Sequence, residues 1–370
     1  MIEPKKNGAM TPKYAVLIGT ILVLLAISVI NGCIYAHAPK PPSYPEIRAA
    51  FFAPDGQSIY FTLIENKVFG LFRMDLNGKV GAWLFRGWPY EPAVSPDGGT
   101  LVFVLNNKKQ WGDLFAMDAD GRNLRWFTSG PNHDRSPRFS HDGKRIFFLR
   151  HDQWGAYPSI DAAEGWDSDI FSLDFATGKI RRISEESFYR VWAFSLFPAD
   201  RFTLIFATEK PKTKVNLWKI SLDGPKKLRS IEPVVRYASS HEVKFNEGII
   251  PAARNCVILS RDGQYLVFAW QKSNHDKSRQ KNYRQIFACS MQSLVAKKVA
   301  AANDLLFPRD ISPNNQWIIF TGPSNKSRFD GGVLYPSNLW MVRRDGSGLK
   351  NFNLDFRGVL DKPPTALRLP

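Results

Sequence analysis

Short apolar runs and polar turns alternate along most of the chain. The runs at 101–105 (LVFVL) and 266–270 (LVFAW) contain only hydrophobic residues, which is typical of β-strands that are covered on both faces. Tight turns rich in Pro, Asp and Gly, such as SPDG at 95–98, precede many of these runs. The hydrophobic pattern therefore predicts a chain of short β-strands joined by tight turns.

A sequence repeat groups these strands into six similar units. In each unit, Asp or Asn is followed four positions later by Ile or Leu and six positions later by Phe. A second motif, Leu or Ile followed by Phe or Trp, comes after each copy of the first. Strict alternation of the two motifs across six copies indicates a repeat architecture. The Phe positions recur about every 52 residues and are Phe61, Phe103, Phe148, Phe206, Phe268 and Phe320.

Each unit is long enough for four strands, with one tight turn between the first two and another between the last two. A single sheet of this kind cannot bury both of its faces, so the repeats must pack face to face. The sequence predicts an all-β fold, a six-bladed β-propeller of four-stranded antiparallel blades over residues 47–354. Either the tail at 355–370 or the segment near residue 46 could close the ring.

Two stretches of this repeat resemble a known family. The residues SPDGGTLVFVL and DLFAMDADGRNLRWFT within 95–128, and FSHDGKRIFFLR and SDIFSLDFATGKIRRIS within 139–184, are similar to the repeat of TolB-type six-bladed propellers. The resemblance implies an exported binding module and does not imply a reaction. TolB itself has an additional N-terminal α/β domain, whereas this chain has an apolar segment and a spacer there.

The N-terminal region has the features of a membrane anchor. An uncharged apolar segment at 15–30 follows Lys5, Lys6 and Lys13. This arrangement predicts one transmembrane helix, a signal anchor, whose N-terminus stays in the cytoplasm while the rest of the chain is exported. The predicted regions are the N-terminus and anchor at 1–38, a Pro-rich spacer at 39–46, the propeller at 47–354 and the C-terminal tail at 355–370.

Three fates of the apolar segment remain open. Retention as an anchor is favoured by Tyr14 and Tyr35 at its two ends, because Tyr is enriched at both membrane interfaces. The Gly-Cys pair ending at Cys33 resembles a lipoprotein site, in which Cys33 would carry the lipid. Cleavage after Ala38 is the third alternative, since Ala36 and Ala38 form a small-x-small motif.

The longest insertions in the repeat fall in loops that share one rim of the predicted propeller. Long loops on a rigid scaffold are common places for binding residues, so we expect the binding face at this rim. The insertion at 151–169 is acidic and aromatic, and its candidate partner contacts are Trp154, Tyr157 and Trp166.

The innermost strands begin at the same rim. Aligning the repeats on their turns places four candidate binding residues at equivalent positions, together with Asn255 and Phe307: these are Arg48, Tyr90, Arg135 and Arg190. Three arginines near a channel mouth could bind a carboxylate or another anion. Pairing with neighbours such as Glu91 or Asp134 is the alternative role.

The net charge of the chain indicates what kind of partner it binds. Among its 370 residues, 50 Lys and Arg outnumber 34 Asp and Glu, which gives a net charge of +16. Much of the excess lies at 209–229 and 271–284, on one flank of the propeller. This favours an anionic partner or anionic lipid headgroups, and the exported location argues against a nucleic acid.

No catalytic nucleophile motif, metal-binding motif or phosphate-binding loop occurs in the sequence. We therefore expect no catalytic residues, no metal, no cofactor and no enzymatic activity. The sequence instead predicts a protein-interaction module, an accessory or scaffolding subunit of a bacterial inner-membrane or envelope complex, with the propeller in the periplasm. The alternative is an enzyme or sensor for an acidic glycan or peptide bound at the channel mouth.

Overall fold

The computed structural model places Tyr44–Pro370 in one compact unit. It describes residues 46–65, 68–106, 112–151, 168–184, 190–196, 202–208, 216–221, 229–231, 234–237, 242–244, 257–272, 283–290, 292–293, 295–301, 306–322, 329–330, 333–334, 338–352, 354–356, 358–361 and 363–364. The predicted transmembrane segment and Cys33 lie outside these ranges. Within them, no helix is long and apolar enough to span a membrane.

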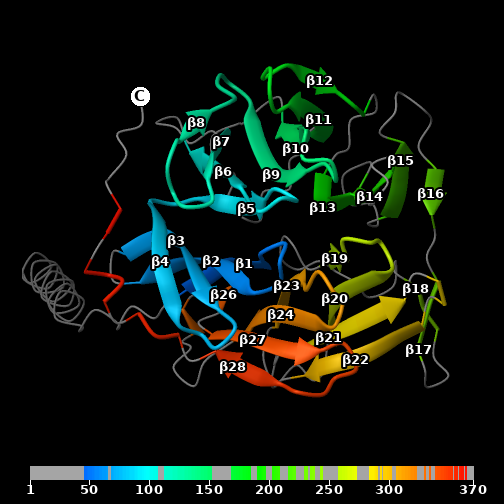
Figure 1. Ribbon diagram of the computed structural model, residues 1–370. Coiled ribbons are helices and arrows are strands. Elements are labelled where there is room, and N and C mark those ends of the chain that lie inside the picture. The colour runs from blue at the N-terminus through cyan, green and yellow to red at the C-terminus, as the bar shows by residue number, and fades with distance from the viewer. Residues whose placement is uncertain are drawn as a thin grey trace, which may run out of the picture. The chain divides into compact units, whose positions relative to one another are not determined.

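The described residues form an all-β propeller, as predicted, and five of its sheets are four-stranded antiparallel blades (Figure 1). The first blade consists of β1 (Glu46–Phe52), β2 (Ser58–Glu65), β3 (Val68–Asp75) and β4 (Val80–Arg86). The second consists of β5 (Tyr90–Val94), β6 (Thr100–Asn106), β7 (Gly112–Asp118) and β8 (Arg125–Trp126). The third consists of β9 (His133–Phe139), β10 (Arg145–His151), β11 (Ser168–Asp174) and β12 (Ile180–Arg182). The other two consist of β13 (Arg190–Leu196), β14 (Phe202–Thr208), β15 (Asn216–Ser221) and β16 (Arg229–Ile231); and β23 (Phe307–Ile311), β24 (Trp317–Gly322), β27 (Asn338–Arg343) and β28 (Lys350–Phe352).

The prediction of six four-stranded blades is wrong, because the described chain has five. The fifth repeat forms a six-stranded sheet, the enlarged sheet, in the order β18-β17-β22-β21-β20-β19. Its strands are β17 (Val234–Tyr237), β18 (Glu242–Lys244), β19 (Val257–Leu259), β20 (Tyr265–Lys272), β21 (Tyr283–Ser290) and β22 (Val295–Ala301). The segment around 230–251, which the repeat assigns to a loop, supplies β17, and β17 pairs in parallel with the edge strand β22.

A short hairpin lies in the insertion of the last repeat. It consists of β25 (Phe329–Asp330) and β26 (Val333–Leu334), which pair with each other and with no other described strand. The hairpin therefore belongs to the loop between β24 and β27 and leaves the four-stranded blade intact.

Neighbouring sheets pack face to face through hydrophobic side chains. The Phe85 and Phe103 rings, from the first and second blades, lie 5.0 Å apart in one such cluster. Similar clusters join three further pairs of sheets. Burying one Phe side chain stabilises a fold by about 2 kcal/mol, which explains why the repeat retains it. The repeat Phe residues that are at most 2% exposed are Phe61, Phe103, Phe148, Phe268 and Phe320.

The tight turn between the first two strands of a blade has a recurring hydrogen-bond pattern. In the second blade, the Ser95 hydroxyl donates to Asp97 Oδ1 at 2.5 Å, and the Thr100 N–H donates to Ser95 Oγ at 2.9 Å. Gly98 has a φ of 76°, a conformation that glycine adopts without strain. The same pattern of bonds recurs at Ser140, Ser260 and Ser312.

These turns also contact one another along one rim. A Cβ atom built on Gly98 would lie 3.6 Å from Pro54 Cδ of the preceding blade, and one on Gly143 would lie 3.5 Å from Pro96 Cδ. Where a Gly of one turn meets a Pro of the next, these residues therefore serve two purposes: they shape the hairpin, and they pack against a neighbouring turn in the ring.

Acidification should weaken these turns. The Ser95 hydroxyl and the Gly99 N–H hold the pKa of Asp97 below its ordinary value of 3.8, and the Ser140 hydroxyl and the Lys144 N–H do the same for Asp142. Because the folded pKa is lowered, both carboxylates stabilise the fold above about pH 4, and this contribution is lost as the pH falls through the folded pKa.

Urea unfolding followed by tryptophan fluorescence between pH 6 and pH 2.5 would measure this effect. A double variant, Asp97→Asn with Asp142→Asn, should lose less stability than the wild type over the acidic part of this range. Equal losses in the two proteins would show that the turn carboxylates are not responsible.

The C-terminal segment closes the ring by joining the outer edge of the first blade. The Val80 N–H donates to the Asp355 carbonyl at 3.2 Å, and the Asp355 N–H donates to the Gly78 carbonyl at 3.3 Å. The Phe356 ring packs against those of Phe61 and Phe72 at 6.1 and 5.7 Å. Residue 46 begins the innermost strand of its own blade, so the tail makes the closing contact.

Candidate functional site

The first strand of each repeat lies innermost, and most of these strands contain a β-bulge. β1 contacts β5 and β23, β5 contacts β9, and β19 contacts β13 and β23. The pairing of β1 shifts between Ile47 and Ala49, and that of β23 shifts between Pro308 and Asp310. Such bulges bend a strand and re-aim side chains, and they are frequent beside functional sites. A group of side chains near the bulges therefore forms the candidate site.

An aromatic and cationic patch lies at the start of β1 and β5. The Arg48 guanidinium lies 5.4 Å from the centre of the Trp88 ring and pairs with Glu46 at 2.7 Å. Trp88 also packs against Phe69 at 4.8 Å and Tyr90 at 6.4 Å. Despite these contacts Trp88 remains 42% exposed, so part of its ring is open to a partner. We call Arg48, Phe69, Trp88 and Tyr90 the mouth cluster.

A nearly buried ion pair lies beside the mouth cluster and joins two blades. Arg135 Nη2 on β9 donates to Glu91 Oε1 on β5 at 2.7 Å, and their side chains are 13% and 11% exposed. Glu91 Oε2 also accepts the Ser136 N–H at 2.7 Å. Glu91 and Ser136 have φ values of 49° and 52°, which are unusual for residues other than glycine. The pair therefore holds two distorted strands together.

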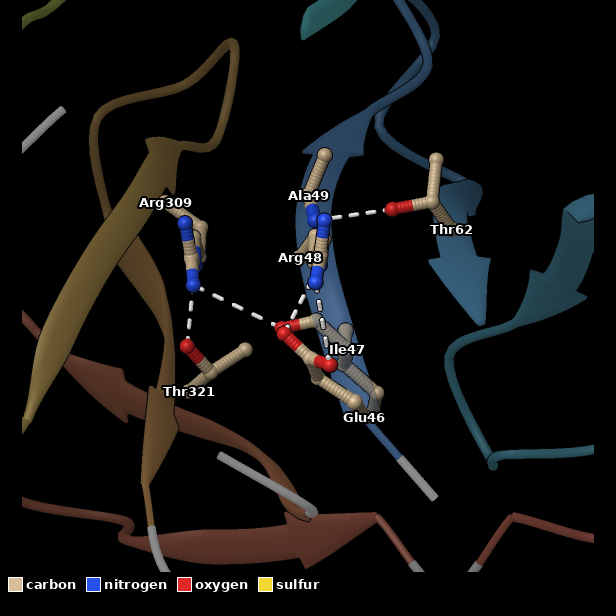
Figure 2. A network of polar contacts seen from close by, with 7 residues as sticks. All are labelled: Glu46, Ile47, Arg48, Ala49, Thr62, Arg309 and Thr321. Carbon is tan, nitrogen blue, oxygen red and sulfur yellow. Dashed lines mark hydrogen bonds and ion pairs between the residues drawn. The ribbon is translucent and has the colours of Figure 1, made fainter. Parts of the chain in front are cut away.

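Arg309 is a further arginine of this site that the sequence alignment did not select. Figure 2 shows it between β23 and β1, where its Nε donates to Thr321 Oγ1 at 2.8 Å and its Nη2 to the Ile47 carbonyl at 3.5 Å. On the other side of the β1 bulge, the Ala49 N–H donates to Thr62 Oγ1 at 3.0 Å. Side chains thus satisfy backbone groups that the bulge leaves without a strand partner.

Proline inside an inner strand is the sequence signal for these bulges. Pro92, Pro137 and Pro308 lie inside inner strands, and proline within a strand is found mainly at edges and bulges because it cannot donate to the ladder. Arg48 and Phe307 share a position only if the inner strands of all repeats are regular, and the bulges of β1 and β23 break that register.

The structure places three of the predicted ring residues on neighbouring inner strands: Arg48 on β1, Tyr90 on β5 and Arg135 on β9. Arg190 begins β13, but its side chain lies outside the described atoms. The predicted contacts Trp154, Tyr157 and Trp166 lie outside the described residues. For Arg48 and Arg135, the neighbouring carboxylates Glu46 and Glu91 are direct partners.

Two buried histidines lie close together in the third blade. The His133 and His151 rings are 6.0 Å apart, and the Gly112 N–H donates to His133 Nδ1 at 2.6 Å. Beside them Arg150 binds Asp134 through two hydrogen bonds, at 2.7 and 2.9 Å. Within the described ranges, no three His, Cys, Asp or Glu side chains are grouped so that they could hold a metal ion.

No family model matches the chain, and no curated protein is similar to it in sequence. Solved structures with a similar fold include an oligogalacturonate lyase in complex with manganese, with 13% identity over 84% of this chain and 78% of that one and a TM-score of 0.53. Another solved structure with a similar fold is a prolyl endopeptidase, with 11% identity over 84% of this chain and 50% of that one and a TM-score of 0.53.

TolB from Acinetobacter baumannii is also similar, with 16% identity, a TM-score of 0.46 and coverage of 68% of this chain. The matched region spans only 53% of the length of that TolB chain. At these identities the comparisons show the fold alone, which is a β-propeller.

The comparisons correct one expectation from the sequence. The absence of catalytic motifs predicted a protein that is not an enzyme, but the same fold occurs in an oligogalacturonate lyase and a prolyl endopeptidase. Short sequence motifs are a poor guide here because a propeller can collect catalytic side chains from several distant repeats. The exclusion of enzymatic activity is therefore withdrawn.

Proposed function

We propose that this protein is a membrane-tethered, periplasmic β-propeller that binds a protein partner through its mouth cluster, as an accessory or scaffolding subunit of an inner-membrane or envelope complex. The observation that carries the proposal is Trp88, which is 42% exposed and lies beneath the Arg48 guanidinium. Trp and Arg are the side chains most enriched at the energetic centres of protein interfaces.

Contacts within the chain support each side of the mouth cluster. Glu46 holds Arg48 in place, while Phe69 and Tyr90 support two sides of Trp88. Side chains restrained by such contacts lose less conformational entropy on binding, so more of their contact energy contributes to affinity. The cluster lies at the rim where the sequence also places Trp154, Tyr157 and Trp166, which we retain as proposed contacts.

The membrane part of the proposal rests on the N-terminal sequence. The apolar segment at 15–30, with lysines before it and a Pro-rich spacer after it, would tether the propeller on the periplasmic side of the inner membrane. The basic blocks at 209–229 and 271–284 would then favour anionic lipid headgroups or an acidic partner.

Replacing Trp88 by alanine should release the partner. The loss of an interface anchor costs about 2 kcal/mol or more, which corresponds to roughly a thirty-fold loss of affinity. The tagged full-length protein is purified from native membranes in mild detergent, and the proteins that co-purify are quantified by mass spectrometry.

Trp126 provides a matched control, because it is 48% exposed but lies on the outer strand β8. Trp126→Ala should retain the partner that Trp88→Ala loses. Purification of the wild type as a lone monomer, or equal recovery of the same partner with both variants, would contradict the proposal.

A further inference from the structure

The tight turn between β3 and β4 carries an asparagine followed by a glycine. The Asp75 N–H donates to the Lys79 carbonyl at 3.1 Å, and the Gly78 N–H donates to the Asp75 carbonyl at 3.2 Å. Gly78 has a φ of 92°, as expected for the glycine that follows a type I turn in a hairpin. Asn77 comes just before this glycine and is exposed. The turn therefore presents an Asn-Gly pair at the surface.

The same turn receives two of the contacts that close the ring. The Gly78 carbonyl accepts the Asp355 N–H of the C-terminal segment at 3.3 Å. From the last blade, Lys350 Nζ donates to the Leu76 carbonyl at 2.7 Å. The carbonyls of the residues on both sides of Asn77 thus carry hydrogen bonds that join the first blade to the end of the chain.

The side chain of Asn77 is available for reaction. Its backbone N–H donates to Asp75 Oδ1 at 2.8 Å, but within the described part of the chain its side-chain amide has no hydrogen-bond partner. By contrast, Asn123 in the turn of the second blade donates through Nδ2 to Asp118 at 2.6 Å and precedes Leu124. Among the described asparagines only Asn77 is followed by glycine, which has no Cβ to hinder an attack by its nitrogen.

Asparagine is among the chemically labile residues of proteins, and here the reaction needs only Asn77, Gly78 and water. The Gly78 nitrogen loses its proton to hydroxide and attacks Asn77 Cγ, which closes a cyclic succinimide as the Cγ–Nδ2 bond breaks and ammonia leaves. Water then opens the ring at either carbonyl carbon and yields aspartate or isoaspartate. The bond from the Gly78 N–H to Asp75, at 3.2 Å, lies at the long end of the hydrogen-bond range, so it holds the nitrogen weakly.

We propose that Asn77 is a site of spontaneous deamidation and that the isoaspartate formed there loosens the closure of the propeller ring. In isoaspartate the main chain passes through Cβ. One extra atom then separates the two ring-closing carbonyls, which shifts them against each other and weakens their bonds to Lys350 and Asp355. The site is independent of the mouth cluster, and a failure of either proposal leaves the other standing.

Ageing of the full-length protein in detergent micelles tests the modification. Samples are kept at pH 8 and at pH 6 and are digested at intervals. Mass spectrometry of the peptides quantifies isoaspartate at position 77 separately from any formed at Asn7 and Asn31, which glycine also follows. Because the attacking nitrogen must lose its proton, isoaspartate at position 77 should accumulate several-fold faster at pH 8. An unmodified position 77 in the aged protein would overturn the proposal.

Limited proteolysis of the same samples measures ring closure. The C-terminal segment of the aged wild type should be cut several-fold faster than that of the fresh protein, whereas aged Asn77→Ala should match its fresh form. Fresh Asn77→Asp supplies the charge without the extra main-chain atom. The second blade has Asp120 at the equivalent position of its turn, so the ring of this variant should stay closed.

Three results would overturn the link between deamidation and ring closure. Cutting of the wild type that does not change on ageing is the first, and cutting of Asn77→Ala that accelerates as much as that of the wild type is the second. Cutting of fresh Asn77→Asp as fast as that of the aged wild type is the third, because it would assign the effect to the charge and not to the main chain.

Discussion

Replacing Glu91 by alanine should lower the free energy of unfolding by about 3 kcal/mol, because it breaks a nearly buried ion pair and leaves one charge behind. The variant loses the bond to Arg135 at 2.7 Å and the bonds to the Ser136 N–H and hydroxyl at 2.7 and 3.1 Å. Arg135, whose side chain is 13% exposed, would keep its charge without a carboxylate.

The effect should extend beyond a single pair, because Glu91 joins the β5 and β9 strands at their bulges. With φ values of 49° and 52°, Glu91 and Ser136 persist in these conformations only where surrounding contacts hold them. Urea unfolding followed by tryptophan fluorescence measures the loss, and Glu91→Gln should recover part of it because an amide still accepts hydrogen bonds.

Glu46→Ala is the matched control for this prediction. Glu46 pairs with Arg48, also at 2.7 Å, but the Arg48 side chain is 41% exposed. Exposed pairs contribute about 1 kcal/mol or less, so this variant should unfold at nearly the same urea concentration as the wild type. A similar loss of unfolding free energy in the two variants would show that the Glu91 pair stabilises the fold no more than an exposed pair does.

Replacing Phe356 by alanine should destabilise the propeller by about 2–3 kcal/mol. Its ring packs against Phe61 and Phe72 of the first blade, while the adjacent Asp355 forms the bridge to Lys79. The substitution removes the apolar contact that holds the tail against that blade and opens the closure of the ring. Thermal unfolding measured by circular dichroism would show a lower midpoint.

Leu349 serves as the control for the closing segment. It lies in the same terminal region but is 58% exposed, so Leu349→Ala should change stability by less than about 0.5 kcal/mol. Limited proteolysis adds a second readout: the C-terminus should be cut faster in Phe356→Ala than in the wild type. An unchanged midpoint and cutting rate would rule out the tail as the closing element.

The repeat and its turns could be predicted well because they depend on local chemistry. The Phe61 and Phe103 positions are buried at sheet interfaces, as the hydrophobic runs indicate. The Ser-Pro-Asp-Gly turn at Ser95 forms from bonds between residues at most five positions apart. Such contacts recur at Ser140, Ser260 and Ser312 in the described residues, so the copies reinforce one interpretation.

The contacts around the candidate site could not be derived from the repeat, because bulges change which side chains share a position. Side chains alternate between the two faces of a strand, and one extra residue reverses that alternation. Arg48 is the extra residue in β1, but Arg309, not Phe307, holds that place in β23. The ion pair of Arg135 with Glu91 likewise depends on the bulges of two different blades, which the repeat does not indicate.

The sequence by itself determined the all-β class, the repeated strands and the turn chemistry, because these follow from side-chain periodicity and from contacts within a few residues. Only the tertiary structure decided that the fifth repeat forms a six-stranded sheet, that Asp355 and Phe356 close the ring, and that Glu91 pairs with Arg135 between two blades. Each of these depends on residues far apart in the chain, and their pairing is set by the packing of whole blades, which no local pattern specifies.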